Sequence, residues 1–250
     1  MKKALHSRAR AARSRLVAAA LGVAWLWPAI ARADDVAAPA PAPAPVHARP
    51  PSDARLLLTR LDVHDFSVVE RESGPFSYYK IVEDPVEPFI RAVYRPPLET
   101  VVVGVDVGDE LRSTSKKLRW KWRAMALPKD GDECRDGFTD SAAAVYVAWK
   151  RFLKIYSLKL VWSTRGKKGQ ICAPTRNLFL EQDTVVLESG GPIGVWVNEE
   201  IDLVALFRAR FGDGDPEAEV PDFLGIGVMS DGDQTLSLSE ADYTNFAILH

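Results

Sequence analysis

The feature that most constrains the fold is an alternation of apolar and charged residues in the middle of the chain. Between residues 118 and 125, Leu118, Trp120 and Trp122 occupy every second position, and arginine or lysine stands between them. Successive side chains of a β-strand point to opposite faces, so this spacing predicts a strand with one buried and one solvated face. Segments 142–152 and 158–163 repeat the pattern. We therefore expect sheets that bury one face and expose the other.

Similar apolar runs, separated by turn-forming residues, extend the prediction to the rest of the chain. The predicted strands are Tyr78–Glu83, Phe89–Tyr94, Thr100–Val107, Leu118–Met125, Ala142–Phe152, Leu158–Ser163, Thr184–Glu188, Gly194–Val197, Leu224–Met229 and Tyr243–Leu249. One helix is predicted over 199–211, where apolar residues recur at helical spacing before Gly212. Many short strands with one helix do not alternate as β-α-β units. They predict an all-β, antiparallel β-sandwich with one short helix.

The N-terminal segment has the three parts of a secretory signal peptide. A basic start precedes the apolar stretch Leu16–Ile30, and the small-residue site Ala31-Arg32-Ala33 follows. The apolar stretch is shorter than the roughly 20 residues that span a bilayer as a helix. We predict cleavage of residues 1–33 and a periplasmic or secreted protein. An uncleaved N-terminal anchor is the alternative.

Residues 34–51 form an Ala/Pro-rich linker, because alternating prolines favour an extended spacer. Residues 52–250 are then expected to form a single domain. The chain carries 32 basic and 34 acidic residues, and seven of the basic ones lie in residues 1–33. The remainder is therefore strongly acidic, which makes nucleic-acid binding a poor expectation.

Two cysteines, Cys134 and Cys172, are present. Export would place them in an oxidising compartment, so we predict that they form a disulfide bond. Two free thiols are the alternative. No histidine lies near either cysteine, which disfavours a zinc site.

An ordered set of motifs resembles an uncharacterised exported bacterial family, unknown-function domain 3047. The matching stretches are 79–84, 118–122, 145–147, 160–162, Trp196, 211–212 and 225–233. The resemblance implies a jelly roll of the galactose-binding type, with a ligand site on a loop rim or a concave face. This chain departs from the family pattern by carrying Thr139, Ala144, Ile201 and Leu206 where the family has polar residues. These departures indicate either an altered site or the loss of a buried ion-pair network.

Acidic and aromatic side chains are the candidate ligand-binding residues. Asp231 and Asp233 follow an apolar strand, and Asp140 closes an acidic loop that begins at residue 130. Carboxylate oxygens suit calcium, so a calcium ion is left open as a cofactor and no other cofactor is expected. Strand aromatics either stack on sugar rings or build the core. The predicted ligand-binding set is Asp140, Tyr146, Trp149, Trp196, Asp231 and Asp233.

No nucleophile motif with its partners occurs, and beyond the linker the only histidines are His64 and His250. No catalytic residue is therefore predicted. The leading hypothesis is an exported, non-catalytic β-sandwich that binds a carbohydrate or another cell-envelope component. A carboxylate-based polysaccharide hydrolase or lyase and an envelope structural or assembly protein are the alternatives. Contact with a membrane is expected only through an uncleaved signal segment.

Overall fold

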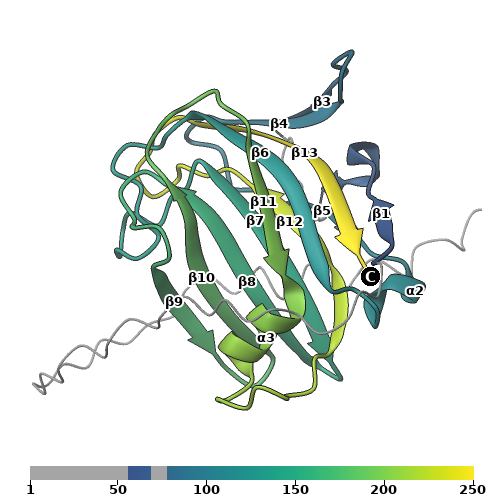
Figure 1. Cartoon of the computed structure of the whole chain (residues 1–250). Coiled ribbons are helices and arrows are strands. Elements are labelled where there is room, and N and C mark those ends of the chain that lie inside the picture. The colour runs from purple at the N-terminus through teal and green to yellow at the C-terminus, as the bar shows by residue number, and fades with distance from the viewer. Residues whose placement is uncertain (1–55, 69–77) are drawn as a thin grey trace, which may run out of the picture.

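A computed structural model describes residues 56–68 and 78–250 of the chain. Two β-sheets pack face to face with the hydrophobic core between them (Figure 1). The predicted signal peptide 1–33, the linker 34–51 and the first four residues of the predicted domain lie outside the described residues. Among the described helices, none has the length and apolar character needed to cross a bilayer.

The first sheet is antiparallel throughout, and its outer strands bring distant parts of the chain together. Its strands in spatial order are β11 (Val197–Asp202), β6 (Lys117–Ala126), β13 (Ser239–Leu249), β4 (Phe89–Tyr94) and β3 (Tyr79–Val82), with β1 (Leu58–Arg60) paired to the end of β13.

The second sheet contains one parallel pair, which the sequence did not predict. Its strands in spatial order are β2 (Ser67–Val68), β5 (Val103–Asp106), β12 (Asp222–Met229), β7 (Ala143–Arg151), β8 (Lys154–Ser163), β10 (Leu180–Ser189) and β9 (Ile171–Arg176). Strands β8 and β10 are parallel because β9 lies between them in the chain and pairs on the far side of β10. Strand β9 carries Pro174 and mostly exposed side chains, so its apolar signal is weak. The antiparallel β-sandwich is otherwise as predicted.

The alternating tryptophans form the core, as the period-two pattern predicted. Trp120, Trp122 and Trp162 are each at most 1% exposed, and Trp122 makes edge contacts with the other two. The arginines and lysines between them on β6 lie on the outer face of the first sheet and pair with acidic residues there.

The predicted helix begins four residues too early, and the predicted strand Gly194–Val197 is wrong. Residues 197–202 form β11, which pairs with β6 and places Ile201 inward, and α3 covers only Leu203–Phe211. The side chain of Asp202 caps α3 by accepting a hydrogen bond from Ala205 N. Acidic residues are typical of the first turn of a helix, which is why this segment was predicted to be helical. Here Glu200 instead pairs with Lys117 and Arg119 of the neighbouring strand β6. Within residues 56–68 and 78–250, two further short helices are present, η1 (Val63–Asp65) and α2 (Asp109–Arg112).

Candidate functional site

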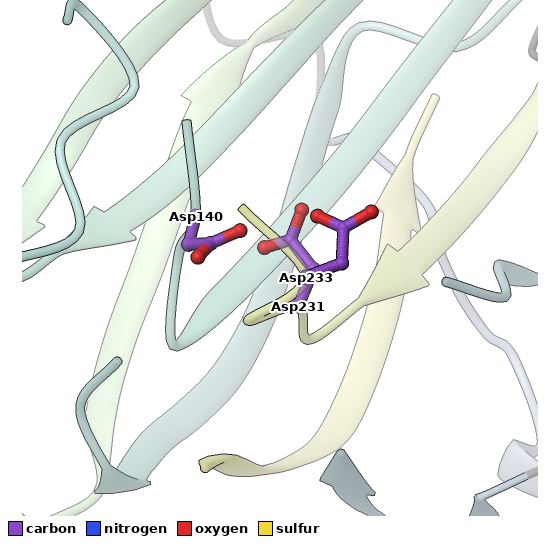
Figure 2. A group of neighbouring side chains, drawn as sticks. All are labelled: Asp140, Asp231 and Asp233. Carbon is purple, nitrogen blue, oxygen red and sulfur yellow. The ribbon is translucent and has the colours of Figure 1, made fainter. Parts of the chain in front are cut away.

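Three of the predicted site residues meet at one end of the second sheet. Strand β7 starts beside the end of β12 because the two are antiparallel neighbours. Asp140 precedes β7, and Asp231 and Asp233 follow β12, so their carboxylates face one another (Figure 2). One oxygen from each of the three carboxyl groups lies within 4.8 Å of the others. We call Asp140, Asp231 and Asp233 the aspartate cluster.

Asp140 is fully buried and fastens the turn after β12. Its carboxylate accepts hydrogen bonds from Gln234 N at 3.2 Å, Thr235 N at 2.7 Å and Thr235 Oγ1. Asp140 thus orders the turn that carries Asp233.

Asp231 is buried in a network that contains one cation and several carboxyl groups. It accepts a hydrogen bond from Ser141 N at 2.8 Å, and Lys159 Nζ lies 3.8 Å from its other oxygen. Lys159 also pairs at 2.6 Å with Glu133, which is buried as well. Burial raises the pKa of Asp231 to about 8, against the opposing effect of Lys159 and with a further rise from Glu133. The protonated form of Asp231 is therefore favoured near neutral pH.

Asp233 is the partly exposed member of the cluster, and burial together with the neighbouring Asp140 raises its pKa. Three carboxyl groups beside one lysine that is already paired with Glu133 leave excess negative charge. Protons reduce that excess, as the raised pKa values indicate. The donor set consists of hard carboxylate oxygens and also suits calcium, for which Asp231 and Asp233 offer oxygens.

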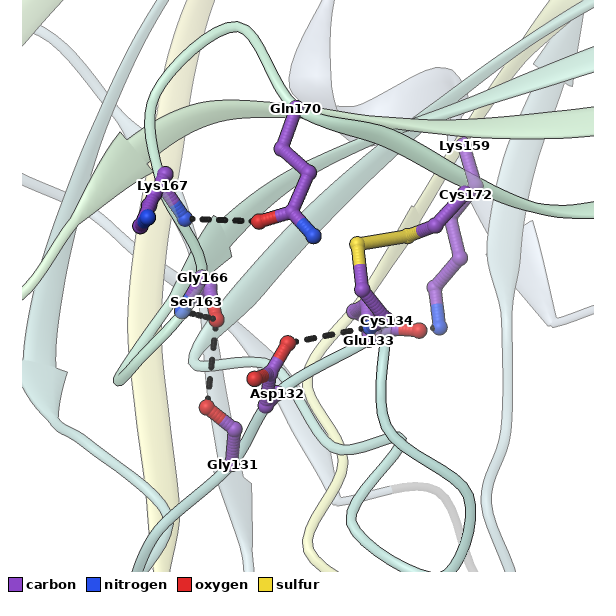
Figure 3. Close-up of a disulfide and its surroundings, with 10 residues drawn as sticks. All are labelled: Gly131, Asp132, Glu133, Cys134, Lys159, Ser163, Gly166, Lys167, Gln170 and Cys172. Carbon is purple, nitrogen blue, oxygen red and sulfur yellow. Dashed lines mark hydrogen bonds and ion pairs between the residues drawn. A yellow bond between two sulfur atoms is a disulfide. The ribbon is translucent and has the colours of Figure 1, made fainter. Parts of the chain in front are cut away.

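The predicted disulfide is confirmed, and it holds a loop over the outer face of the second sheet. Cys134 and Cys172 are bonded with their Cα atoms 5.2 Å apart (Figure 3). The bond fixes the residue next to Glu133, the partner of Lys159. Cys134 also packs against the apolar cluster that includes Tyr146 on this face.

Two of the aromatic residues that were predicted to bind a ligand are buried in the structure. Trp149 is 1% exposed and packs against Phe207, Phe211 and Phe223, so its assignment as a ligand-binding residue is corrected to core. Its alternating position fits either role, and helix α3 decides it by covering this part of the sheet. Tyr146 lies beneath the disulfide loop near Lys159 and is also buried.

Trp196 is partly exposed and lies on the outer face of the first sheet. The guanidinium group of Arg123 stacks 4.4 Å from its ring, and Phe89 meets its ring edge-on at 5.8 Å. Beneath them Asp242, which is fully buried, binds both Arg91 and Arg123 at 2.7 Å. This ion pair holds the arginines under the aromatic rings. We call Trp196, Arg123 and Phe89 the aromatic platform.

A groove of about 510 Å³ adjoins the same sheet. Its lining residues are Arg60, Leu61, Asp62, Val63, Val86, Glu87, Pro88, Thr244, Asn245 and Phe246. It adjoins the platform's sheet face because Glu87 pairs with Lys121 of β6 and Thr244 lies on β13. The lining combines hydrogen-bonding groups with apolar ones, as ligand sites do.

Sequence reasoning missed this groove. Its walls come from three segments, 60–63, 86–88 and 244–246, which only the fold brings together. His64 beside it was considered only as a catalytic base. Its two ring nitrogens instead contact Glu83 at 2.8 Å and Asp62 at 2.6 Å. These bonds, that of Glu83 first, raise the pKa of His64 to about 9, so it is a charged bridge between two carboxylates.

The family model described as "Protein of unknown function (DUF3047)" matches residues 77–247, which is more than half of the chain. The chain belongs to this family. The family description assigns no activity. Three of the positions at which this member departs from the family pattern, Ala144, Ile201 and Leu206, lie in or against buried apolar clusters. In this chain they contribute to packing, and none of them lines the groove.

Solved structures with a similar arrangement are distant in sequence. Endoglucanase Cel12A from Rhodothermus marinus is 10% identical, with a TM-score of 0.41 over 78% of this chain and 96% of its own. The xyloglucanase domain of NopAA from Sinorhizobium fredii, in complex with cellobiose, is 9% identical, with a TM-score of 0.37 over 77% and 97%. Endoglucanase 3 from Trichoderma harzianum is 9% identical, with a TM-score of 0.32 over 80% and 99%. These likenesses concern β-sandwich architecture and imply no activity. No curated protein sequence matches this chain.

Proposed function

We propose that this protein is an exported, non-catalytic β-sandwich that binds a carbohydrate of the cell envelope on the outer face of its first sheet. The observation that carries the proposal is the groove of about 510 Å³, whose lining residue Pro88 directly precedes Phe89 of the aromatic platform. A sugar presents apolar C–H faces and a rim of hydroxyl groups. The groove and platform offer both matching surfaces, an aromatic ring and several polar side chains.

The polar lining is already oriented by hydrogen bonds within the protein. Arg60 donates a bond to Asn245 Oδ1, and Thr244 Oγ1 donates one to Pro88 O. Asp62 is held by His64, and Glu87 is held by Lys121. Side chains fixed before binding lose less entropy when the ligand arrives, which favours a preformed site.

The test is binding of the full-length chain to a panel of soluble polysaccharides and peptidoglycan fragments, with and without calcium. We expect saturable binding that Trp196→Ala and Arg60→Ala each weaken at least tenfold, or about 1.4 kcal/mol. Phe152→Ala is the matched control, because it removes an exposed aromatic ring outside this face. Equal binding by Trp196→Ala and the parent protein contradicts the proposed surface. No binding to any glycan contradicts the function and favours a structural or assembly role in the envelope.

A carboxylate-based polysaccharide hydrolase or lyase is the second candidate function. It is favoured by the raised pKa of Asp231 and by Asp233 facing it, since such enzymes use a pair of carboxyl groups of which one donates a proton. It is weakened by the burial of Asp231 and by the position of the described groove away from the cluster. Release of reducing ends from the bound glycan, lost in Asp233→Asn and retained in Trp196→Ala at saturating glycan, would favour the enzyme.

A further inference from the structure

Four large apolar side chains gather at the tips of two turns without any role in the core. Phe152 and Leu153 form the turn between β7 and β8, and are 91% and 78% exposed. Leu178 and Phe179 lie in the turn between β9 and β10, and are 78% and 60% exposed. Isolated exposed leucines are ordinary on protein surfaces, but a contiguous apolar patch marks an interaction site.

The two turns lie side by side. Strands β8 and β10 are parallel neighbours, so both begin at the same end of the second sheet, toward α3 (Figure 1). Ile155 N donates a hydrogen bond to Phe179 O at 2.8 Å, and Lys154, the first residue of β8, pairs with Glu181 of β10. Phe152, Leu153, Leu178 and Phe179 thus form one projecting ridge, which we call the apolar tip.

Folding alone does not account for a phenylalanine at the first tip position. Phe152 has a φ of 54°, in the left-handed region where glycine or asparagine is favoured and a bulky residue is strained. Its side chain gains almost no burial in return, since 91% of it is exposed. A residue that is unfavourable for the turn and unused by the core is explained by a contact outside the molecule.

Basic side chains flank the apolar tip. Lys150, Arg151 and Lys154 surround the first turn, and Arg176 precedes the second. Phospholipid headgroups present phosphate oxygens next to hydrocarbon, which matches apolar tips with lysine and arginine set behind them. A bilayer surface also accepts projecting side chains without the shape complementarity that a rigid protein partner requires.

We propose that the apolar tip inserts into the surface of a phospholipid bilayer, with the flanking lysines and arginines at the level of the headgroup phosphates. The cations are partly neutralised by ion pairs, Arg151 by Glu219, Lys154 by Glu181 and Arg176 by Asp183. Insertion therefore depends on apolar area more than on net charge. It occurs on zwitterionic phosphatidylcholine and changes little with salt, whereas binding through net positive charge would require anionic lipid.

The test uses the full-length chain with an environment-sensitive dye attached within the apolar tip. The dye reports the surroundings of the apolar tip, so vesicle contact through the N-terminal segment alone does not imitate insertion. Leu178→Cys adds one free thiol for the dye, because both native cysteines are in the disulfide. On adding phosphatidylcholine vesicles we expect at least a twofold rise in fluorescence. The further change Phe152→Ser with Leu153→Ser should weaken the lipid dependence at least tenfold.

Leu236→Cys provides the matched control, since Leu236 is 71% exposed and lies outside the tip. An equal fluorescence rise at Leu236, or none at Leu178, overturns the proposal. A rise at Leu178 that depends on protein concentration without vesicles also overturns it, in favour of a second copy of the chain on the tip. The readout does not involve glycans, so its result is separate from that of the proposed function.

Discussion

At the scale of single residues, the most unusual position is Asp231, a carboxyl group buried among other carboxyl groups. Burial disfavours its charged form, the neighbours Glu133 and Asp140 add repulsion, and Lys159 offsets these effects only in part because Glu133 lies closer to it. The native state therefore retains a proton on Asp231 that an unfolded aspartate, with a pKa near 3.9, releases well below neutral pH. This difference couples folding to pH.

We predict that stability falls as pH rises through this interval, and that Asp231→Asn removes the fall. Between the unfolded pKa near 4 and the folded pKa of about 8, the native state holds more protons than the unfolded state. The free energy of unfolding then decreases by up to about 1.4 kcal/mol per pH unit. Asparagine stays neutral and keeps an oxygen for Ser141 N, so the variant should show a flatter profile from about pH 5 to about pH 8.

Urea unfolding at several pH values measures this difference. Asp109→Asn is the control, because the side chain of Asp109 is 93% exposed and should leave the pH dependence of the parent protein intact. Parallel profiles for Asp231→Asn and the parent protein would show that Asp231 is ionised in the native state. Repeating the series with excess calcium tests whether a cation replaces the proton in the aspartate cluster.

At the scale of secondary-structure elements, the sequence predicted best where one local pattern decides the structure. Strand β4 was predicted with its observed bounds, and β6 to within one residue at each end, because their side chains alternate between core and outer face. The segment 199–202 was assigned to the helix because its acidic residues fit a helical first turn. Pairing with the basic face of β6 outweighs that local preference.

In the candidate site too, local patterns predicted single residues, and the fold decides which of them meet. Asp140, Asp231 and Asp233 were predicted individually, and their meeting follows from the pairing of β7 with β12, which no local pattern specifies. The aromatic residues were ambiguous because core and surface positions on a strand have the same spacing. The placement of α3 over Trp149 and of the disulfide loop over Tyr146 separates these two residues from Trp196, which stays partly exposed.

The corrected helix boundary yields a prediction for Asp202. Its side chain accepts a hydrogen bond from Ala205 N at 2.8 Å, which satisfies one of the free amides at the start of α3. Asp202→Ala should lower the free energy of unfolding by about 1 kcal/mol, as measured by urea denaturation. Asp202→Asn should restore most of the loss, because asparagine also caps helices. A negligible effect of Asp202→Ala would indicate that the helix starts elsewhere.

At the scale of the whole molecule, the two faces of the sandwich differ in what covers them. The disulfide loop covers part of the second sheet's outer face and brings Glu133 to Lys159. The first sheet's outer face carries the aromatic platform and adjoins the groove. The covered face thus contributes stability and order, and the open one is available for a ligand.

Because the disulfide lies on the covered face and the groove adjoins the open one, we predict that the disulfide is needed for stability and not for the shape of the groove. The bond joins residues 38 positions apart, so its loss should lower the free energy of unfolding by roughly 4 kcal/mol through the entropy of the unfolded chain. Releasing the loop should also loosen Glu133 from Lys159. Replacing both cysteines with serine should therefore lower the urea midpoint strongly, while the folded fraction binds glycan with unchanged affinity.

The disulfide can stabilise the protein through the entropy of the unfolded chain and by positioning Glu133 against Lys159. Combining Cys134→Ser and Cys172→Ser with Glu133→Gln separates these two contributions. If the disulfide acts partly by positioning Glu133, then Glu133→Gln should cost less in the serine variant than in the parent protein. Additive losses would show that the bond acts on the unfolded chain alone. A serine variant that is folded and stable but has lost glycan binding would contradict the division, because the covered face would then support the open one.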